Sequence, residues 1–170
     1  ALECARARFS NRGGYSLNAD GIHIEGSVRL SDGFYDGEIC FVGGSIGSNL
    51  ECVRGTFVSP DRMTINGDHI RVGADILLRE CMSEGQVRLL GGKIGGSLDC
   101  GYGRFRNVDG HAIDADRLDV AGDVSFLRAR AIGVVHLKGA QIRGSLACHG
   151  AQFFNPGRDT LDGDRMTVGG

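Results

Sequence analysis

Apolar residues recur along this chain at successive intervals of two, three, two and four positions. Val135, Leu137, Ala140 and Ile142 illustrate one such module. A helix would place apolar residues three and four positions apart, whereas pairs spaced by two are typical of short extended segments. The pattern therefore predicts short strands joined by tight corners, with the first, third, sixth and eighth residues of each module facing inward.

The module occurs fourteen times, and the gaps between successive starts follow the order 15, 11, 11 and 11. The starts are Leu2, Leu17, Val28, Ile39, Leu50, Ile65, Ile76, Val87, Leu98, Ile113, Val124, Val135, Leu146 and Leu161. Four modules thus make one repeat with a period of 48, and the same interval separates Cys4, Cys52, Cys100 and Cys148. A fixed period of this length is the signature of a repeat architecture.

The inward positions predict the fold class. Among the 56 of them only Tyr35 and Ser83 are neither apolar nor glycine, and none is charged. Two modules complete one turn of four short faces, so coil lengths of 22 and 26 alternate, the longer coils being those that contain the long gap. We predict an all-β fold, a right-handed parallel β-helix (four-sided β-solenoid) of about seven coils. Residues 1–170 form a single domain built from this repeat, expected to be a fragment without end caps, which solenoids need for solubility.

Two polar or small residue types are predicted to shape the corners. Glycine recurs at the tenth residue of most modules, where we expect positive φ, which glycine adopts at little cost. Asp20, Asp68, Asp116 and Asp164 follow the long gaps, and their carboxylates are expected to cap local turns by accepting backbone N–H groups. The alternative, a ladder of calcium sites, requires several oxygen ligands around each ion.

A resemblance to known families is carried by Gly133-Val-Val-His-Leu-Lys-Gly-Ala-Gln-Ile-Arg-Gly-Ser-Leu-Ala-Cys-His-Gly-Ala-Gln-Phe-Phe-Asn-Pro-Gly157. This stretch resembles pentapeptide-repeat proteins, which fold as right-handed four-sided β-helices, and is more similar still to long bacterial proteins labelled membrane-associated oxidoreductase. The resemblance covers all fourteen modules but departs from the five-residue pattern by an extra residue at every second corner and four more in every fourth module. It implies a β-helix and redox chemistry.

The composition argues against some classes of partner and does not indicate a specific one. The chain is 41% hydrophobic and 24% charged, with a net charge of −2. A nucleic-acid-binding protein normally carries a basic excess, so no nucleic-acid partner is predicted. No apolar stretch approaches the roughly 18 to 20 residues of a membrane span, and none is expected in this segment.

The cysteines are predicted to be structural. Cys4, Cys52, Cys100 and Cys148 share one inward column, two coils apart, which is about 9.6 Å at the strand spacing and beyond the ~7 Å reach of a disulfide. We expect reduced, buried thiols, which favour the cytoplasm without establishing the location. Cys40 is the one outward cysteine, and we expect it to react fastest.

No constellation of catalytic or ligand-binding residues emerges. His23, His69, His111, His136 and His149 occupy five different module positions, so we expect no shared ligand set. Neither a Gly-x-Ser-x-Gly elbow nor a strand–glycine–helix dinucleotide fingerprint is present. We therefore predict no catalytic, cofactor-binding or metal-ligating residues and no cofactor, and we do not expect this segment to be an enzyme.

The longer connections are the predicted partner-binding ridge. Residues 10–16, 58–64, 106–112 and 154–160 recur on every second coil and project along one edge, unless they only cover the core. The candidate residues are Arg12, Asp61, Arg62, Arg106, Asp109, Phe154, Arg158 and Asp159. We predict a structural or protein-binding scaffold. The alternatives are part of an oxidoreductase whose site lies outside this segment, and end-to-end self-association through unpaired strand edges.

Overall fold

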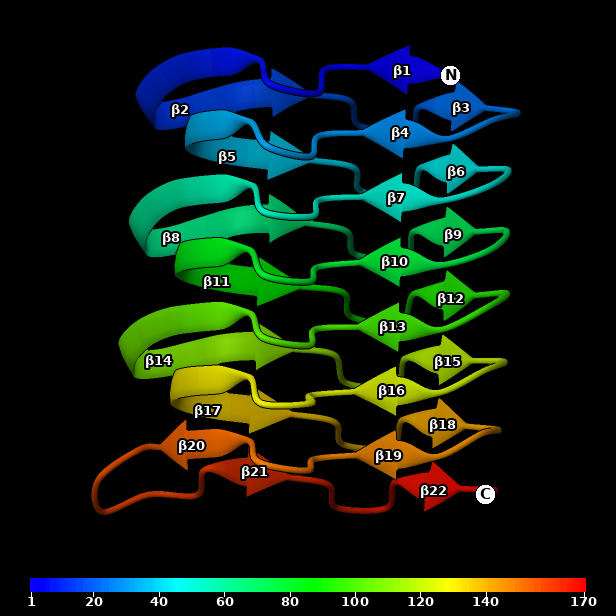
Figure 1. Ribbon diagram of the computed structural model, residues 1–170, viewed down its shortest axis with the longest axis vertical. Coiled ribbons are helices and arrows are strands. Elements are labelled where there is room, and N and C mark those ends of the chain that lie inside the picture. Colours follow the sequence, from blue (N-terminus) through cyan, green and yellow to red (C-terminus); the bar gives the residue numbers. More distant parts are fainter.

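The computed structural model describes residues 1–170 as a stack of coils made of strands and turns. It contains no helix, and therefore none that could serve as a membrane span. The coils follow one another along the long axis, with the N-terminus at one end and the C-terminus at the other (Figure 1). Three parallel sheets extend along the stack. The predicted all-β solenoid of about seven coils is confirmed.

The first and third sheets take one strand from each coil, and the second sheet takes two, β20 (Gln152–Phe154) and β21 (Leu161–Asp162), from the last coil. The first sheet contains β1 (Leu2–Glu3), β4 (Val28–Arg29), β7 (Leu50–Glu51), β10 (Ile76–Leu77), β13 (Leu98–Asp99), β16 (Val124–Ser125) and β19 (Leu146–Ala147). The second contains β2 (Arg8–Asn18), β5 (Phe34–Cys40), β8 (Thr56–Asn66), β11 (Met82–Arg88), β14 (Arg104–Asp114), β17 (Arg130–His136), β20 (Gln152–Phe154) and β21 (Leu161–Asp162). The third contains β3 (His23–Ile24), β6 (Ser45–Ile46), β9 (Arg71–Val72), β12 (Lys93–Ile94), β15 (Asp119–Val120), β18 (Gln141–Ile142) and β22 (Thr167–Val168).

The strand register confirms the alternation of coil lengths. Glu3 pairs with Arg29, an offset of 26, and Arg29 pairs with Glu51, an offset of 22. The alternation continues along this column, because Glu51 pairs with Leu77 at an offset of 26 and Leu77 pairs with Asp99 at an offset of 22. Residues one coil apart, at offsets of 22 or 26, therefore lie directly above one another. Neighbouring outward side chains can be identified from these offsets.

The second sheet supplies two of the four faces. Its seven-residue strands β5, β11 and β17 curl back on themselves in Figure 1 and change register beside Gly37, Gly85 and Gly133. We call the part before this bend, such as residues 34–36, the second face, and the part after it, such as 38–40, the third face. In β2, β8 and β14 the four additional residues lie at the bend and form the ridge loops.

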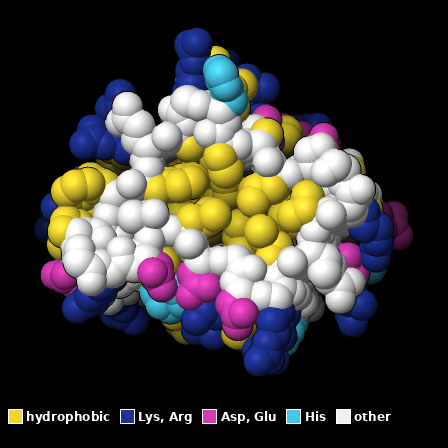
Figure 2. All heavy atoms as spheres, turned by 90° about the horizontal axis from the view of Figure 1, so that it is seen from below, with side chains coloured by type: hydrophobic (Ala, Val, Ile, Leu, Met, Phe, Trp, Pro, Cys, Tyr) yellow, Lys and Arg dark blue, Asp and Glu magenta, His cyan; other side chains and the backbone are white.

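The inward side chains form one apolar cluster along the whole stack. Figure 2, seen along the axis from the C-terminal end, shows apolar side chains in the interior and charged ones around the rim. The two polar inward residues are both satisfied. The Tyr35 hydroxyl donates to the Cys4 carbonyl oxygen at 2.7 Å, and the hydroxyl oxygens of Ser83 and Thr64 are 2.7 Å apart. The predicted module register is therefore confirmed.

The left-handed corners differ from the prediction. Positive φ occurs at the fifth residue of all fourteen modules, glycine or not: Arg6, Gly21, Asp32, Gly43, Arg54, His69, Glu80, Gly91, Tyr102, Arg117, Arg128, Gly139, Gly150 and Arg165. These residues also bond the neighbouring coil, as where the Arg54 N–H donates to the Arg79 carbonyl at 3.0 Å. Such bonds repeat along the stack and offset the strain of placing side chains at these corners.

At the tenth residue, where glycine suggested positive φ, only Gly37, Gly85 and Gly133 have it. At Gly96, Gly122 and Gly144 glycine is needed for a different reason. A Cβ on Gly144 would lie 2.2 Å from an Asp123 carboxylate oxygen of the preceding coil. Close approach between coils, rather than φ, therefore explains this glycine.

Candidate functional site

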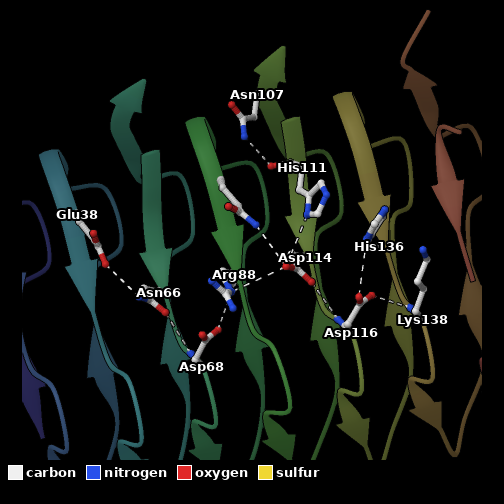
Figure 3. A network of polar contacts seen from close by, with 11 residues as sticks. Glu38, Asn66, Asp68, Arg88, Asn107, His111, Asp114, Asp116, His136 and Lys138 are labelled. Atoms are coloured by element: carbon white, nitrogen blue, oxygen red, sulfur yellow. Dashed lines mark hydrogen bonds and ion pairs between the residues drawn. The ribbon is translucent and has the colours of Figure 1, made fainter. Parts of the chain in front are cut away.

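A column of polar side chains covers the outer surface of the third face. The in-register members are Asn18, Cys40, Asn66, Arg88, Asp114, His136 and Asp162. Figure 3 shows how side chains from adjacent coils of this surface point toward one another. We call this surface the polar face.

Every second residue of the column caps a turn. The side-chain oxygens of Asn18, Asn66, Asp114 and Asp162 accept the backbone N–H two residues later at 3.2 to 3.4 Å. The donors of these bonds belong to Asp20, Asp68, Asp116 and Asp164, so the prediction that these aspartates cap the turns through their own carboxylates is wrong. Instead, the Asp116 carboxylate accepts the N–H of Lys138 on the next coil at 2.8 Å. This aspartate links coils rather than closing a turn.

Acidic and basic side chains alternate along the polar face and form ion pairs. Arg88 Nε lies 3.1 Å from an Asp68 carboxylate oxygen and 3.8 Å from one of Asp114. Lys138 Nζ lies 2.9 Å from an Asp162 oxygen, and this hydrogen bond lowers the pKa of Asp162. Burial has the opposite effect at Asp68 and raises its pKa.

Two histidines meet on this face. The ring centroids of His111 and His136 are 4.1 Å apart, and the rings are tilted by 34°. His111 Nδ1 is 3.6 Å from an Asp114 oxygen, and ligand atoms of the three side chains all lie within 4.8 Å of one another. The different module positions of the histidines led us to expect no shared ligand set, but His111 and His136 lie together beside Asp114.

The register of the coils explains why His111 and His136 meet. Asp114 pairs with His136 at the shorter of the two coil offsets, and His111 precedes Asp114 by three residues at the exit of a ridge loop. Module position alone does not show this contact. His111 lies in a ridge loop, and the additional residues of that loop have no counterpart in the shorter modules. The short offset from Asp114 to His136 was the usable signal in the sequence.

A cleft of about 300 Å³ opens beside the two histidines. It lies between the ridge loops 106–112 and 154–160, since the intervening coil carries no loop. Its side-chain lining includes Asp109, His111, Val134, His136, Lys138, Asn155, Arg158, Asp159 and Asp162. The structure therefore brings three of the predicted ridge residues to one cleft: Asp109, Arg158 and Asp159.

Other predicted ridge residues tie loops together. Arg62 donates to the carbonyl of Gly13, and Arg158 donates to the carbonyl of Asp109 at 3.2 Å, each reaching the loop of the preceding repeat. Arg12 Nε lies 3.4 Å from an Asp36 oxygen. These contacts are what loops covering the core would make.

The loop tips have a common backbone conformation. Asp61 and Asp109 have φ of 60° and 61°, and Gly13 and Gly157 occupy the equivalent positions with φ of 80° and 72°. Aspartate tolerates this left-handed region better than most residues. The two aspartates therefore have a conformational role at the tip, and Asp109 also faces the cleft.

The remaining two ridge candidates belong to an exposed patch on the second face. Arg106, Ile132 and Phe154 follow one another in register on consecutive coils, and Arg104 pairs with Arg130 in the next outward column. We define the arginine patch as Arg104, Arg106, Arg128 and Arg130, all of which are exposed.

The arginine patch has one acidic neighbour in register, Glu84 opposite Arg106, but no ion pair within its own chain. None of the four guanidinium groups forms an ion pair, whereas Arg29 and Arg54 at other positions do. Exposed apolar side chains border the patch, namely Met82 (42% exposed), Tyr102 (43%) and Phe154 (59%). A hollow of about 620 Å³ lies over Arg104, Arg128 and Arg130. Sequence reasoning missed three of these arginines because they do not lie on a loop.

All six cysteines are free, which confirms the predicted absence of disulfides. Burial raises the pKa of Cys81 to about 12 and the pKa values of Cys52 and Cys100 well above the ordinary value. Thiols of this kind are poor nucleophiles because little thiolate forms. The expected accessibility of Cys40 is wrong: although it faces outward it is only 5% exposed, since Asn18 and Asn66 flank it on the adjacent coils.

We predict a corresponding order of thiol alkylation. Under native conditions Cys4 and Cys148, which are half-buried in the end coils, should react before Cys52, Cys81 and Cys100. Quenched iodoacetamide labelling followed by peptide mass spectrometry measures the order, with urea-unfolded protein as the fully reactive control. Native labelling of Cys52 or Cys100 at the rate of Cys4 would show that the core is more open than described.

Comparison with protein-family models, curated proteins and solved structures found no match to this chain. The parallel β-solenoid agrees with the fold implied by the sequence resemblance.

Proposed function

We propose that this chain is a rigid scaffold that binds a partner protein through the arginine patch. The observation that carries the proposal is the set of four exposed guanidinium groups without a carboxylate partner, bordered by Met82, Tyr102 and Phe154. Arginine and aromatic side chains are enriched at the energetic centres of protein interfaces. The chemistry fits an acidic segment that also carries apolar or aromatic residues.

The solenoid supports this use because it holds the patch at a regular spacing. Arg104 and Arg130 occupy paired positions on adjacent coils, separated by about 4.8 Å of strand spacing. Each planar guanidinium can bind a carboxylate with two parallel hydrogen bonds. Because inter-coil backbone hydrogen bonds already order these strands, binding costs little backbone entropy.

In this proposal only part of the predicted ridge contacts the partner. Arg106 and Phe154 belong to the partner surface, whereas Arg62 and Arg158 hydrogen-bond to neighbouring loops. Charge reversal at Arg62 and Arg158 is therefore expected to loosen the loops rather than to remove the partner contact.

The test uses peptides selected by phage display against the wild-type protein. We expect acidic peptides with aromatic residues, and the Arg104→Glu/Arg130→Glu variant should bind them at least about tenfold more weakly, since reversed charges repel the same carboxylates. Fluorescence anisotropy with synthetic copies of the selected peptides measures affinity, and circular dichroism measures the melting temperature, which should change little.

Arg71→Glu/Lys93→Glu is the matched control, because it makes the same charge change on the exposed third sheet. Its affinity for the selected peptides should stay within about twofold of wild type, apart from a general charge effect that salt removes. Equal binding by the patch variant and the wild type would refute the proposal, as would equal losses in both variants at moderate salt.

A further inference from the structure

We propose that His111, Asp114 and His136 bind a single divalent transition-metal ion such as Zn²⁺. The site is separate from the arginine patch, because it lies on the polar face, and it does not depend on the proposed scaffold function. Two imidazoles and one carboxylate are a ligand set that zinc and related ions favour.

The geometry needs little adjustment to close around an ion. The candidate ligand atoms lie within 4.8 Å of one another, and His111 Nδ1 is already 3.6 Å from the Asp114 oxygen. Ligands at about 2.0 to 2.2 Å from Zn²⁺ in a tetrahedron are separated by roughly 3.3 to 3.6 Å. Small rotations of the two rings about their side-chain bonds are enough to reach this separation.

The surroundings fix Asp114 through a hydrogen bond and flank His136 with two carboxylates. Asp114 keeps one oxygen in its turn, where it accepts the Asp116 N–H at 3.3 Å, while its second oxygen faces His111. His136 Nδ1 lies 3.7 Å from an Asp116 oxygen, and its Nε2 lies 3.9 Å from one of Asp162. Whichever ring nitrogen binds the ion, the other faces a carboxylate, an arrangement that orients metal-bound histidines in proteins.

The neighbouring cations are already engaged with other carboxylates. Lys138 pairs with Asp162 at 2.9 Å, and Arg88 is closer to Asp68 than to Asp114. His111 and His136 both line the cleft described above, so the metal has a route from solvent and room for a water or an additional ligand. With three protein ligands, one coordination position stays open on this side.

A bound ion would connect two coils that differ in length. His111 and Asp114 belong to β14, which carries a ridge loop, and His136 belongs to β17, which does not. Metal binding should therefore stabilise the folded chain and pin the end of the loop to the following coil.

The test is zinc titration of tag-free protein that has been treated with chelator and kept reduced. Isothermal titration calorimetry with ZnCl₂ should give one ion per chain, and CoCl₂ should give the visible absorption bands of tetrahedral cobalt. His111→Ala and His136→Ala should each weaken zinc binding at least about tenfold, because even the loss of a group that only supports a ligand has an effect of this size. His149→Ala, an exposed histidine outside the cluster, should bind like wild type.

Asp114→Asn separates the ligand role from the turn role. Asn66 occupies the equivalent position of the preceding repeat and makes the same hydrogen bond, at 3.4 Å to the Asp68 N–H, so the variant should fold without metal as the wild type does. It loses the anionic ligand, and its zinc affinity should fall at least about tenfold. Absence of zinc binding in the wild type, or unchanged binding in both Asp114→Asn and His136→Ala, would overturn the proposal.

Discussion

Leu98→Asp is expected to prevent the chain from folding. Leu98 is fully buried and pairs in register with Ile76 and Val124 on the coils at either side. A carboxylate there would be an unpaired charge in an apolar column, at a cost of several kcal/mol. This cost is comparable with the total stability of about 5 to 15 kcal/mol that most domains have. Val135→Asp should have the same effect for the same reason.

Circular dichroism and urea unfolding measure this result, with Met82→Asp as the control. Met82 faces outward between Thr56 and Arg104, so its replacement should change the free energy of unfolding by less than about 1 kcal/mol. Lys138, also outward, is a poorer control because it is paired with Asp162. Folded, cooperative Leu98→Asp protein would contradict the inward assignment.

Gly85→Ala is expected to cause the second largest loss. Gly85 has φ of 127°, and a Cβ at this position would lie 2.3 Å from the Ser59 carbonyl oxygen and 2.7 Å from that of Arg62. Both atoms are backbone and cannot rotate away, so the coils must separate locally. We expect the free energy of unfolding to fall by at least about 3 kcal/mol, measured from urea midpoints.

Gly43→Ala is the matched glycine control. Its φ is 63°, and nothing lies within 4 Å of its Cβ position. Equivalent corners of other coils carry His69 and Arg117, so a side chain is compatible with this position. The loss should be about 1 to 2 kcal/mol, the usual cost of left-handed backbone for a residue with a Cβ. Similar losses in both variants would show that φ, not contact between coils, determines the need for Gly85.

Contacts between outward side chains could be predicted from the sequence only where coil length alone decides which residues are neighbours. The pairing of Arg29 with Glu3 and Glu51 follows from coil offsets of 26 and 22, and the longer offset also brings Arg88 toward Asp114. The arginine patch combines residues from a corner, a strand and the start of a loop, so no single column of the repeat contains it. Its lack of acidic partners depends on where every neighbouring carboxylate lies.

The sequence by itself determined the coils, the inward columns and the free state of the cysteines, because backbone hydrogen bonds force residues one coil apart, at offsets of 22 or 26, into register. The tertiary structure alone decided which outward side chains meet where coil length does not determine the neighbours. It placed His111 against His136 through the path of a loop, and it buried the outward Cys40 between two asparagines. Side-chain direction along a strand follows a period of two, but contact across coils depends on loop path, rotamer and the size of neighbouring groups.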